Sequence, residues 1–273
     1  MIVITGATGT VGRPLVQTLI DAGHAVTAVA RTVPTGVAAD LARPETLRPA
    51  LDGADAIFLL IAGDLLVDAG EPDALLETIT AAGVRRVVLL SSQAARTRPS
   101  APSHSRLRAY EDALRRTAAE WTVLRPGGFA SNTFAWVPSV RAARAVAAPF
   151  ADVALPVVDP ADITAVAAAV LTGDGHAGRA YELTGPAAIS PREQTAALAA
   201  ALGEPVAFTE LTRADARAAM LAFMPGPVVE GTLDILGRPA PDEQRVSPDV
   251  ERVLGRPPRS YAEWAAAAID AFR

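Results

Sequence analysis

The 273-residue chain has no cysteine and no lysine, and all 25 of its Lys+Arg residues are arginine. Without cysteine it can form no disulfide bond, no thiolate nucleophile and no cysteine-ligated zinc or iron–sulfur site. Without lysine it cannot form a Schiff base or use a lysine as a catalytic acid or base. Three histidines are present and they lie far apart in the sequence, so we expect no metal site.

Long runs of one residue type are also missing. Half of the residues are hydrophobic, yet no apolar segment approaches the roughly 20 residues that span a bilayer, so we expect no membrane segment. Met1 leads directly into Ile2-Val3-Ile4 without the charged and apolar regions of a secretory signal, which predicts a cytoplasmic location. The net charge of −5 and the lack of basic runs argue against nucleic acid as a partner and favour small molecules.

Short apolar runs alternate with amphipathic stretches, which is the pattern of βαβ units in a parallel sheet. Several of these runs are too apolar to alternate, as expected for strands buried on both faces. Right-handed crossovers between such units predict an α/β fold with a doubly wound parallel Rossmann sheet. We expect strands at residues 2–5, 25–30, 37–39, 55–60, 86–91, 121–125 and 179–183, and helices at 12–22, 45–51, 73–82 and 105–119.

A glycine-rich turn directly follows the first expected strand and precedes the first expected helix. It reads Gly6-Ala7-Thr8-Gly9-Thr10-Val11-Gly12, and this context makes it a candidate dinucleotide-binding turn. Gly6 permits the tight turn, Gly9 allows the pyrophosphate to approach the backbone, and Gly12 allows close packing of helix and strand. The alternative is a glycine-rich turn that binds no ligand.

The end of the second expected strand indicates which dinucleotide would bind. An acidic residue there would bind the ribose 2′-hydroxyl of NAD, whereas an arginine would accommodate the 2′-phosphate of NADP. The sequence has Arg31 at this position, and Arg13 next to the third glycine is a second candidate. NADP(H) is therefore the favoured cofactor; the alternative is that Arg31 is a solvated charge at the end of a strand.

The composition changes after Arg125, where a Pro-Gly-Gly-Phe segment leads into prolines and aromatic residues. We expect residues 1–126 to form the NADP-binding Rossmann core. Residues 127–273 are expected to be a mixed segment that completes the sheet and forms a smaller C-terminal substrate lobe. Within that segment we expect helices near 194–202 and 261–272, with connections at 224–227 and 237–241.

The glycine turn, Arg31 and the segment Ala39-Asp40-Leu41 together resemble the NmrA-like family of atypical short-chain dehydrogenases/reductases. The resemblance covers essentially the whole chain, and it is also carried by Ser91-Ser92, by 121–126, by Asn132, by Asp162-Ile163 and by 254–258. It implies that Asp40 and Leu41 flank the adenine, that Ile61, Ala62 and Gly63 lie near the nicotinamide ribose, and that the segment from Pro126 to Phe129 borders the nicotinamide. For Asp40, an ordinary turn or helix-cap carboxylate is the alternative.

The chain departs from this superfamily at the catalytic residues. Typical members use a serine with Tyr-x-x-x-Lys, but here Tyr110 is followed four positions later by Leu114. Where related atypical reductases have a lysine or histidine near the start of that helix, this chain has Leu107. His104, expected on a loop, is a candidate substitute; a merely exposed histidine is the alternative.

Ser91 and Ser92 follow a central strand, at the edge where ligands bind in open α/β sheets. Either hydroxyl is a candidate for hydrogen bonding to a substrate or to the nicotinamide, and the alternative is that it satisfies backbone groups. A set of apolar residues is a candidate wall for a planar substrate, with core packing as the alternative; it comprises Phe129, Phe134, Trp136, Met220, Phe223 and Met224.

Together these features predict an NADPH-dependent reductase of the atypical short-chain type, acting on a hydrophobic quinone or carbonyl compound. The resemblance extends to quinone reductases and to reductases of aromatic natural-product pathways. Two other hypotheses are a non-catalytic sensor of NAD(P)H and an epimerase acting on sugar nucleotides, and the missing Tyr-x-x-x-Lys argues against the latter.

Overall fold

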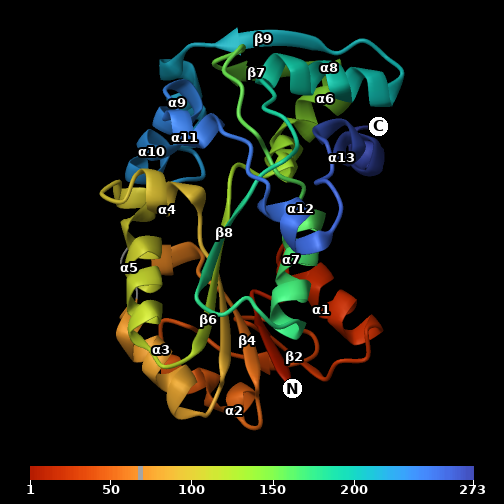
Figure 1. The fold of residues 1–273 in the computed structure, drawn as a ribbon. Helices are drawn as coiled ribbons and strands as arrows, with labels where there is room; N and C mark the ends of the chain where they lie inside the picture. Colours follow the sequence, from red (N-terminus) through yellow and green to blue (C-terminus); the bar gives the residue numbers. More distant parts are fainter. Residues whose placement is uncertain (67–69) are drawn as a thin grey trace. The chain divides into compact units, whose positions relative to one another are not determined.

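The computed structural model describes residues 1–66 and 70–273, and the chain divides into two compact units (Figure 1). The first unit comprises Met1–Pro126, Pro160–Leu183 and Asp249–Gly255; the second comprises Gly127–Asp159, Thr184–Pro248 and Arg256–Arg273. Within the described residues no helix is long and apolar enough to cross a membrane.

The first unit contains a seven-stranded parallel sheet with the order β3-β2-β1-β4-β5-β6-β8, which confirms the doubly wound α/β fold. The strand order reverses between β1 and β4, and ligands bind at such a point in this fold class. All seven expected strands are present, with bounds shifted by at most a few residues: β1 Ile2–Thr5, β2 Val26–Ala30, β3 Val37–Ala38, β4 Ala56–Leu60, β5 Arg86–Leu90, β6 Glu120–Pro126 and β8 Arg179–Leu183.

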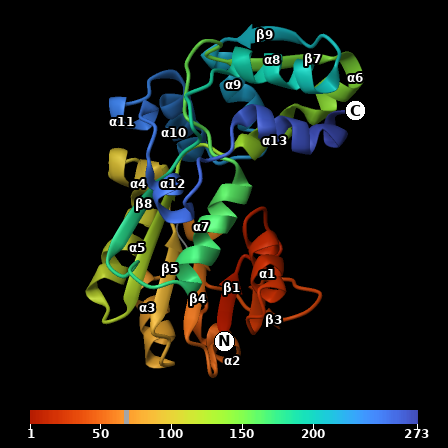
Figure 2. The same cartoon turned by 45° about the vertical axis from the view of Figure 1, so that its right-hand side comes forward.

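Helices cover both faces of this sheet, with α3 and α5 on one side and α1 and α7 on the other (Figure 2). The helices of the unit are α1 Gly12–Asp21, η1 Pro44–Leu47, α2 Arg48–Leu51, η2 Gly63–Leu66, α3 Pro72–Ala81, α4 Gln93–Thr97, α5 Pro102–Arg116, α7 Pro160–Thr172 and α12 Asp249–Leu254. Helix α5 buries one of its sides, because Leu107, Tyr110 and Leu114 lie in one core cluster.

The sequence did not predict helix α7. Its residues Val166, Ala167 and Val170 are fully buried, and Asp162 and Thr164 in its first turns are buried as well. A helix that is apolar on most of its sides shows little periodicity, so the usual sequence signal is absent.

The second unit has a two-stranded parallel sheet and a set of short helices. Strand β7 Ala145–Pro149 pairs with β9 Ala207–Leu211. The helices are η3 Ala130–Trp136, α6 Val137–Ala143, α8 Pro191–Leu202, α9 Arg213–Met220, α10 Gly226–Gly237, α11 Pro241–Gln244, α13 Tyr261–Ala268 and η4 Ile269–Phe272.

The expected connection at 224–227 is partly wrong, because α10 begins at Gly226. Pro227 lies in the first turn of that helix, where the missing N–H of proline costs no hydrogen bond. Of the candidate substrate wall, Phe134 contacts Trp264 and Phe272 in an aromatic cluster, whereas Phe223 is 71% exposed.

Candidate dinucleotide-binding site

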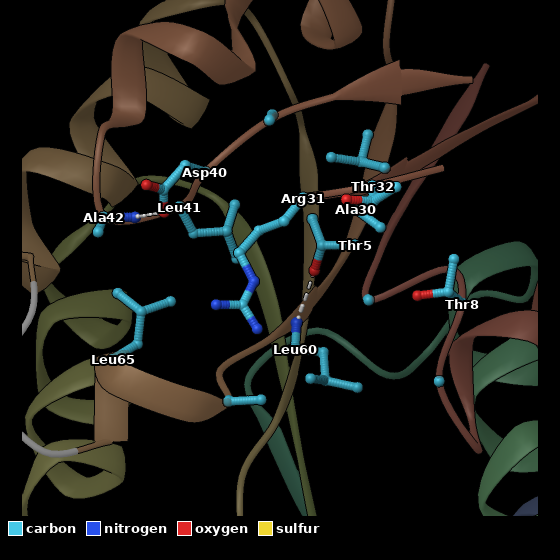
Figure 3. Close-up of a pocket in the computed structure, with 15 residues that line it drawn as sticks. Thr5, Thr8, Ala30, Arg31, Thr32, Asp40, Leu41, Ala42, Leu60 and Leu65 are labelled. Atoms are coloured by element: carbon cyan, nitrogen blue, oxygen red, sulfur yellow. Dashed lines mark hydrogen bonds between the residues drawn. The ribbon is translucent and has the colours of Figure 1, made fainter. Parts of the chain in front are cut away.

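A cavity of about 710 Å3 opens at the carboxyl ends of β1, β2 and β4 (Figure 3). Seven of the expected cofactor residues line it: Gly6, Thr8, Gly9, Arg31, Asp40, Leu41 and Ala62. Other residues complete the lining: Thr5, Val29, Ala30, Thr32, Ala39, Ala42, Leu60 and Leu65. The cavity lies where a doubly wound sheet binds dinucleotides.

The three glycines of the turn have different local requirements. Gly6 has a φ of +64°, a backbone conformation that side chains other than glycine rarely adopt. A Cβ on Gly12 would lie 2.2 Å from the Gly6 carbonyl oxygen, so the helix could not approach the strand. A Cβ on Gly9 would meet the same oxygen at 3.3 Å and no other atom within 4 Å, so the space beside Gly9 is open. Gly9 is therefore dispensable for packing but borders the cavity.

Helix α1 starts beside this turn without a side-chain cap. Its N-cap residue is Val11, whose side chain cannot accept a hydrogen bond. Uncapped N–H groups at the start of a helix are a favourable site for phosphate. The expected cofactor residues Thr10, Val11, Gly12 and Arg13 lie in this turn or in the first helical turn, and none of them is among the residues that line the cavity.

Thr5 joins β1 to β4 through its side chain. Its hydroxyl donates to the Phe58 carbonyl oxygen at 3.0 Å and accepts a hydrogen bond from the Leu60 N–H at 2.8 Å. The backbone register of the two strands runs to the pair Ile4 and Phe58, so the threonine hydroxyl provides the link where the strands diverge. Thr5 also lines the cavity (Figure 3).

Arg31 follows β2 and extends its guanidinium group into the cavity (Figure 3). The structure shows no ion pair of Arg31 with any carboxylate in residues 1–66 or 70–273. Asp40 lines the same cavity while it holds a turn: its carboxylate accepts hydrogen bonds from the Ala42 N–H at 3.0 Å and from Arg43 Nε at 3.2 Å. Asp40 thus stabilises a turn, as the alternative interpretation expected, and also lines the cavity.

The other expected cofactor residues lie outside the cavity lining. Ile61 is buried in the core of the first unit, and Gly63 begins η2 with a φ of +63°. Pro126 is the last residue of β6 in the first unit. Phe129 belongs to the second unit, where it precedes η3 and bridges to Val158.

Ser91 and Ser92, two of the candidate catalytic residues, form hydrogen bonds within the protein. The Ser91 hydroxyl donates to Glu111 Oε1 at 2.7 Å, and the Ser92 hydroxyl caps α4 by accepting from the Ala94 N–H at 3.2 Å. The loop position expected for His104 is wrong, because α5 already begins at Pro102 and includes it. Proline at the start of a helix was misread as part of a loop.

Glu111 was not among the residues expected at the site. Its carboxylate is fully buried and accepts hydrogen bonds from Ser91, Arg125 and Arg115. Burial by itself would raise the pKa of Glu111, but the hydrogen bonds from Arg125, Ser91 and Arg115 outweigh it and hold the pKa below its ordinary value. Glu111 is therefore an ionised buried carboxylate at neutral pH.

Tyr110 lies next to Glu111 and is fully buried in the core cluster. Burial raises the pKa of its hydroxyl, and the nearby Arg106 guanidinium offsets this effect only in part. The position is unsuited to a proton donor that must reach a substrate in solvent-accessible space.

We predict that Gly9→Val leaves the chain folded but abolishes dinucleotide binding, because the branched side chain would fill the space that a pyrophosphate needs. Gly12→Ala is the matched comparison, and we expect it to destabilise the fold by about 1 to 3 kcal/mol through overpacking. Thermal unfolding and fluorescence titration with NADPH separate the two effects. Wild-type affinity in folded Gly9→Val would show that the turn does not bind the phosphates.

The chain matches known proteins along its whole length. Residues 6–174 match the model of a family described as NAD(P)H-binding. A (4-alkanoyl-5-oxo-2,5-dihydrofuran-3-yl)methyl phosphate reductase from Streptomyces griseus is 41% identical over 100% of this chain and 99% of its own length. An NAD(P)H azoreductase from Xenophilus azovorans is 32% identical with the same coverage.

Solved structures agree with this match. An NADPH-dependent quinone oxidoreductase from Escherichia coli, complexed with NADPH, superposes with a TM-score of 0.81 at 25% identity, covering 98% of this chain and 99% of that chain. A structure of NmrA, described as a negative transcriptional regulator, has a TM-score of 0.77 at 18% identity and supports the fold alone. The chain thus belongs to the NAD(P)H-binding family, in agreement with the NmrA-like resemblance, and is an NAD(P)H-dependent oxidoreductase.

Proposed function

We propose that this protein uses NADPH to reduce a small, electron-poor conjugated carbonyl compound, such as a quinone or an unsaturated lactone. The observation that carries this proposal is the full-length match to the Streptomyces griseus reductase. The name of that enzyme describes a substrate with a methyl phosphate group on a 5-oxo-2,5-dihydrofuran ring, whose double bond is conjugated with the ring carbonyl and with an alkanoyl group. Quinones, the substrates named for the Escherichia coli relative, share this electron-poor conjugation.

The residues of the chain suit such a substrate. NADPH supplies a hydride when it is bound, and the substrate then carries the negative charge on a delocalised oxygen. Water can protonate that oxygen, so a strong general acid is less important than it is for a simple ketone. This agrees with the absence of lysine and with the burial of Tyr110. When the substrate is a quinone, it reacts with one NADPH and one proton to give the quinol and NADP+.

The roles of the expected site residues in this proposal follow from their positions. The turn at Gly6, Gly9 and Gly12 would hold the pyrophosphate, and Arg31 would contact the 2′-phosphate in the cavity. Ser92 and His104 stay candidates for contacts with the substrate, and Pro126 and Phe129 stay candidates for the border of the nicotinamide.

The proposal is tested by following NADPH oxidation with a quinone, an acyl-substituted unsaturated lactone and a simple ketone as acceptors. We expect turnover with the first two and little with the ketone. Product analysis by mass spectrometry should show addition of two hydrogen atoms per NADPH consumed. Tight NADPH binding without turnover for any acceptor would contradict the proposal and favour the sensor hypothesis.

We predict that Arg31→Ala weakens NADPH binding by roughly 1 to 3 kcal/mol, the range for a hydrogen bond to a charged group, and leaves NADH binding nearly unchanged. Arg13→Ala tests the second candidate, and Arg48→Ala, an exposed arginine on α2, is the control. Calorimetric titration with both dinucleotides measures the difference. Equal losses for NADPH and NADH would contradict the assignment of Arg31 to the 2′-phosphate.

We predict that Tyr110→Phe keeps most of the reductase activity, because the ring packs in the core and the hydroxyl is buried. The measurement is the single-turnover rate of NADPH oxidation with one quinone, for the variant and the wild type. A loss of about a thousandfold, within the usual scale of a lost general acid or base, would show that Tyr110 is catalytic.

A further inference from the structure

Glu111 brings together three elements at the carboxyl edge of the sheet. Its carboxylate accepts hydrogen bonds from Ser91, which directly follows β5, from Arg125 in β6, and from Arg115 one turn further along α5. Arg125 binds as a fork, with Nε 2.9 Å from Oε1 and Nη2 2.5 Å from Oε2. A single buried carboxylate therefore fixes the ends of two neighbouring strands relative to one helix.

Packing alone does not explain this charge. Glu111 lies on the buried side of α5 beside Tyr110, Leu107 and Leu114, where an apolar side chain would fill the same space. Replacing a buried ion pair by apolar residues is often neutral or stabilising, because the desolvation cost of the charges is removed. What an apolar residue cannot provide is the set of directional hydrogen bonds to Ser91 and Arg125.

These bonds determine how the chain leaves β5. The Ser91 N–H donates to the Leu124 carbonyl oxygen at 2.8 Å, and its hydroxyl donates to Glu111, so the residue is held at two points. Ser92, the next residue, caps α4. The exit from β5 is thereby fixed against β6 and α5.

The exit from β5 also adjoins the cavity. Leu60 lines the cavity at the end of β4, and its register partner is Leu90, the residue before Ser91. Ligands in this fold class bind outside these strand ends. Hydride transfer depends steeply on geometry, and a misplacement of about 1 Å can cost a hundredfold in rate.

We infer that Glu111 is a positioning residue for hydride transfer: through Ser91 and Arg125 it holds the ends of β5 and β6 where the reacting part of the substrate and cofactor must meet. The inference rests on the proposed function. It assigns Ser91 a supporting role beneath the site. It also implies that Glu111 contacts neither the substrate nor the cofactor.

The test compares Glu111→Gln with Asp112→Asn, the same chemical change on the neighbouring residue. Asp112 pairs with Arg108 and Arg115 at the surface of α5 and is 43% exposed. For each variant we would measure the dissociation constant of NADPH, the single-turnover rate of hydride transfer to a quinone, and the unfolding temperature. We expect Glu111→Gln to slow hydride transfer about 10- to 100-fold while NADPH affinity stays within about twofold. Asp112→Asn should match the wild type in the rate of hydride transfer and in NADPH affinity.

Ser91→Ala is the second variant, and it decides the question if Glu111→Gln does not fold, because it removes one hydrogen bond and no charge. We expect it to slow hydride transfer, and we expect the double variant to be no slower than Glu111→Gln, since both changes break one network. Rates equal to the wild type in both single variants would overturn the inference. Slow hydride transfer in Ser91→Ala together with a normal rate in Glu111→Gln would also overturn it. A parallel loss of rate, NADPH affinity and folding in the variants would do the same.

The two proposals fail in different ways. Wild-type protein that is inert toward every acceptor overturns the proposed function and the inference with it. Wild-type protein that is active, with variants that transfer hydride normally, overturns the inference alone.

Discussion

The cofactor side of this protein depends on one close contact, between the start of α1 and the turn that follows β1. At Gly12 there is no room for a side chain, because a Cβ would lie 2.2 Å from the Gly6 carbonyl oxygen. This contact fixes where the helix begins and therefore where the N–H groups of its first turn lie. The space beside Gly9 and the link that Thr5 makes to β4 then define the cavity on the other side of the turn. A side chain at Gly12 would displace the start of the helix from the turn.

Local sequence patterns predicted much of the fold because parallel strands are short, apolar and separated by amphipathic helices. The glycine turn and Arg31 were predictable for the same reason, since each depends on residues next to a strand end. The contacts of Thr5 and Glu111 were not, because the partners are 53 or more positions away for Thr5, and 14 and 20 positions away for Glu111. Pairing across that distance depends on strand order and register, which no local pattern contains.

The errors at His104 and Gly226 have one physical cause. In both places a proline begins or nearly begins a helix, at Pro102 and Pro227, and its context of serine or glycine suggested a loop. Proline is compatible with the first helical turn because the N–H groups there have no partner within the helix. Helix α7 was not predicted for a different reason. Its residues are buried on most of its sides, so no polar face marks the helical period in the sequence.

The lack of lysine has one consequence at Glu111 and another for the expected chemistry. At Glu111 an arginine is the better partner, because the planar guanidinium group of Arg125 binds both carboxylate oxygens, which an ammonium group cannot do with the same geometry. In the expected chemistry the loss is larger, because an arginine stays protonated at any working pH and cannot exchange a proton with a substrate. The arginines of the chain can thus bind anionic groups, but none of them can protonate a substrate. Electron-poor conjugated carbonyl compounds suit a protein without such a proton donor, because the anion formed by their reduction is stable enough to take its proton from water.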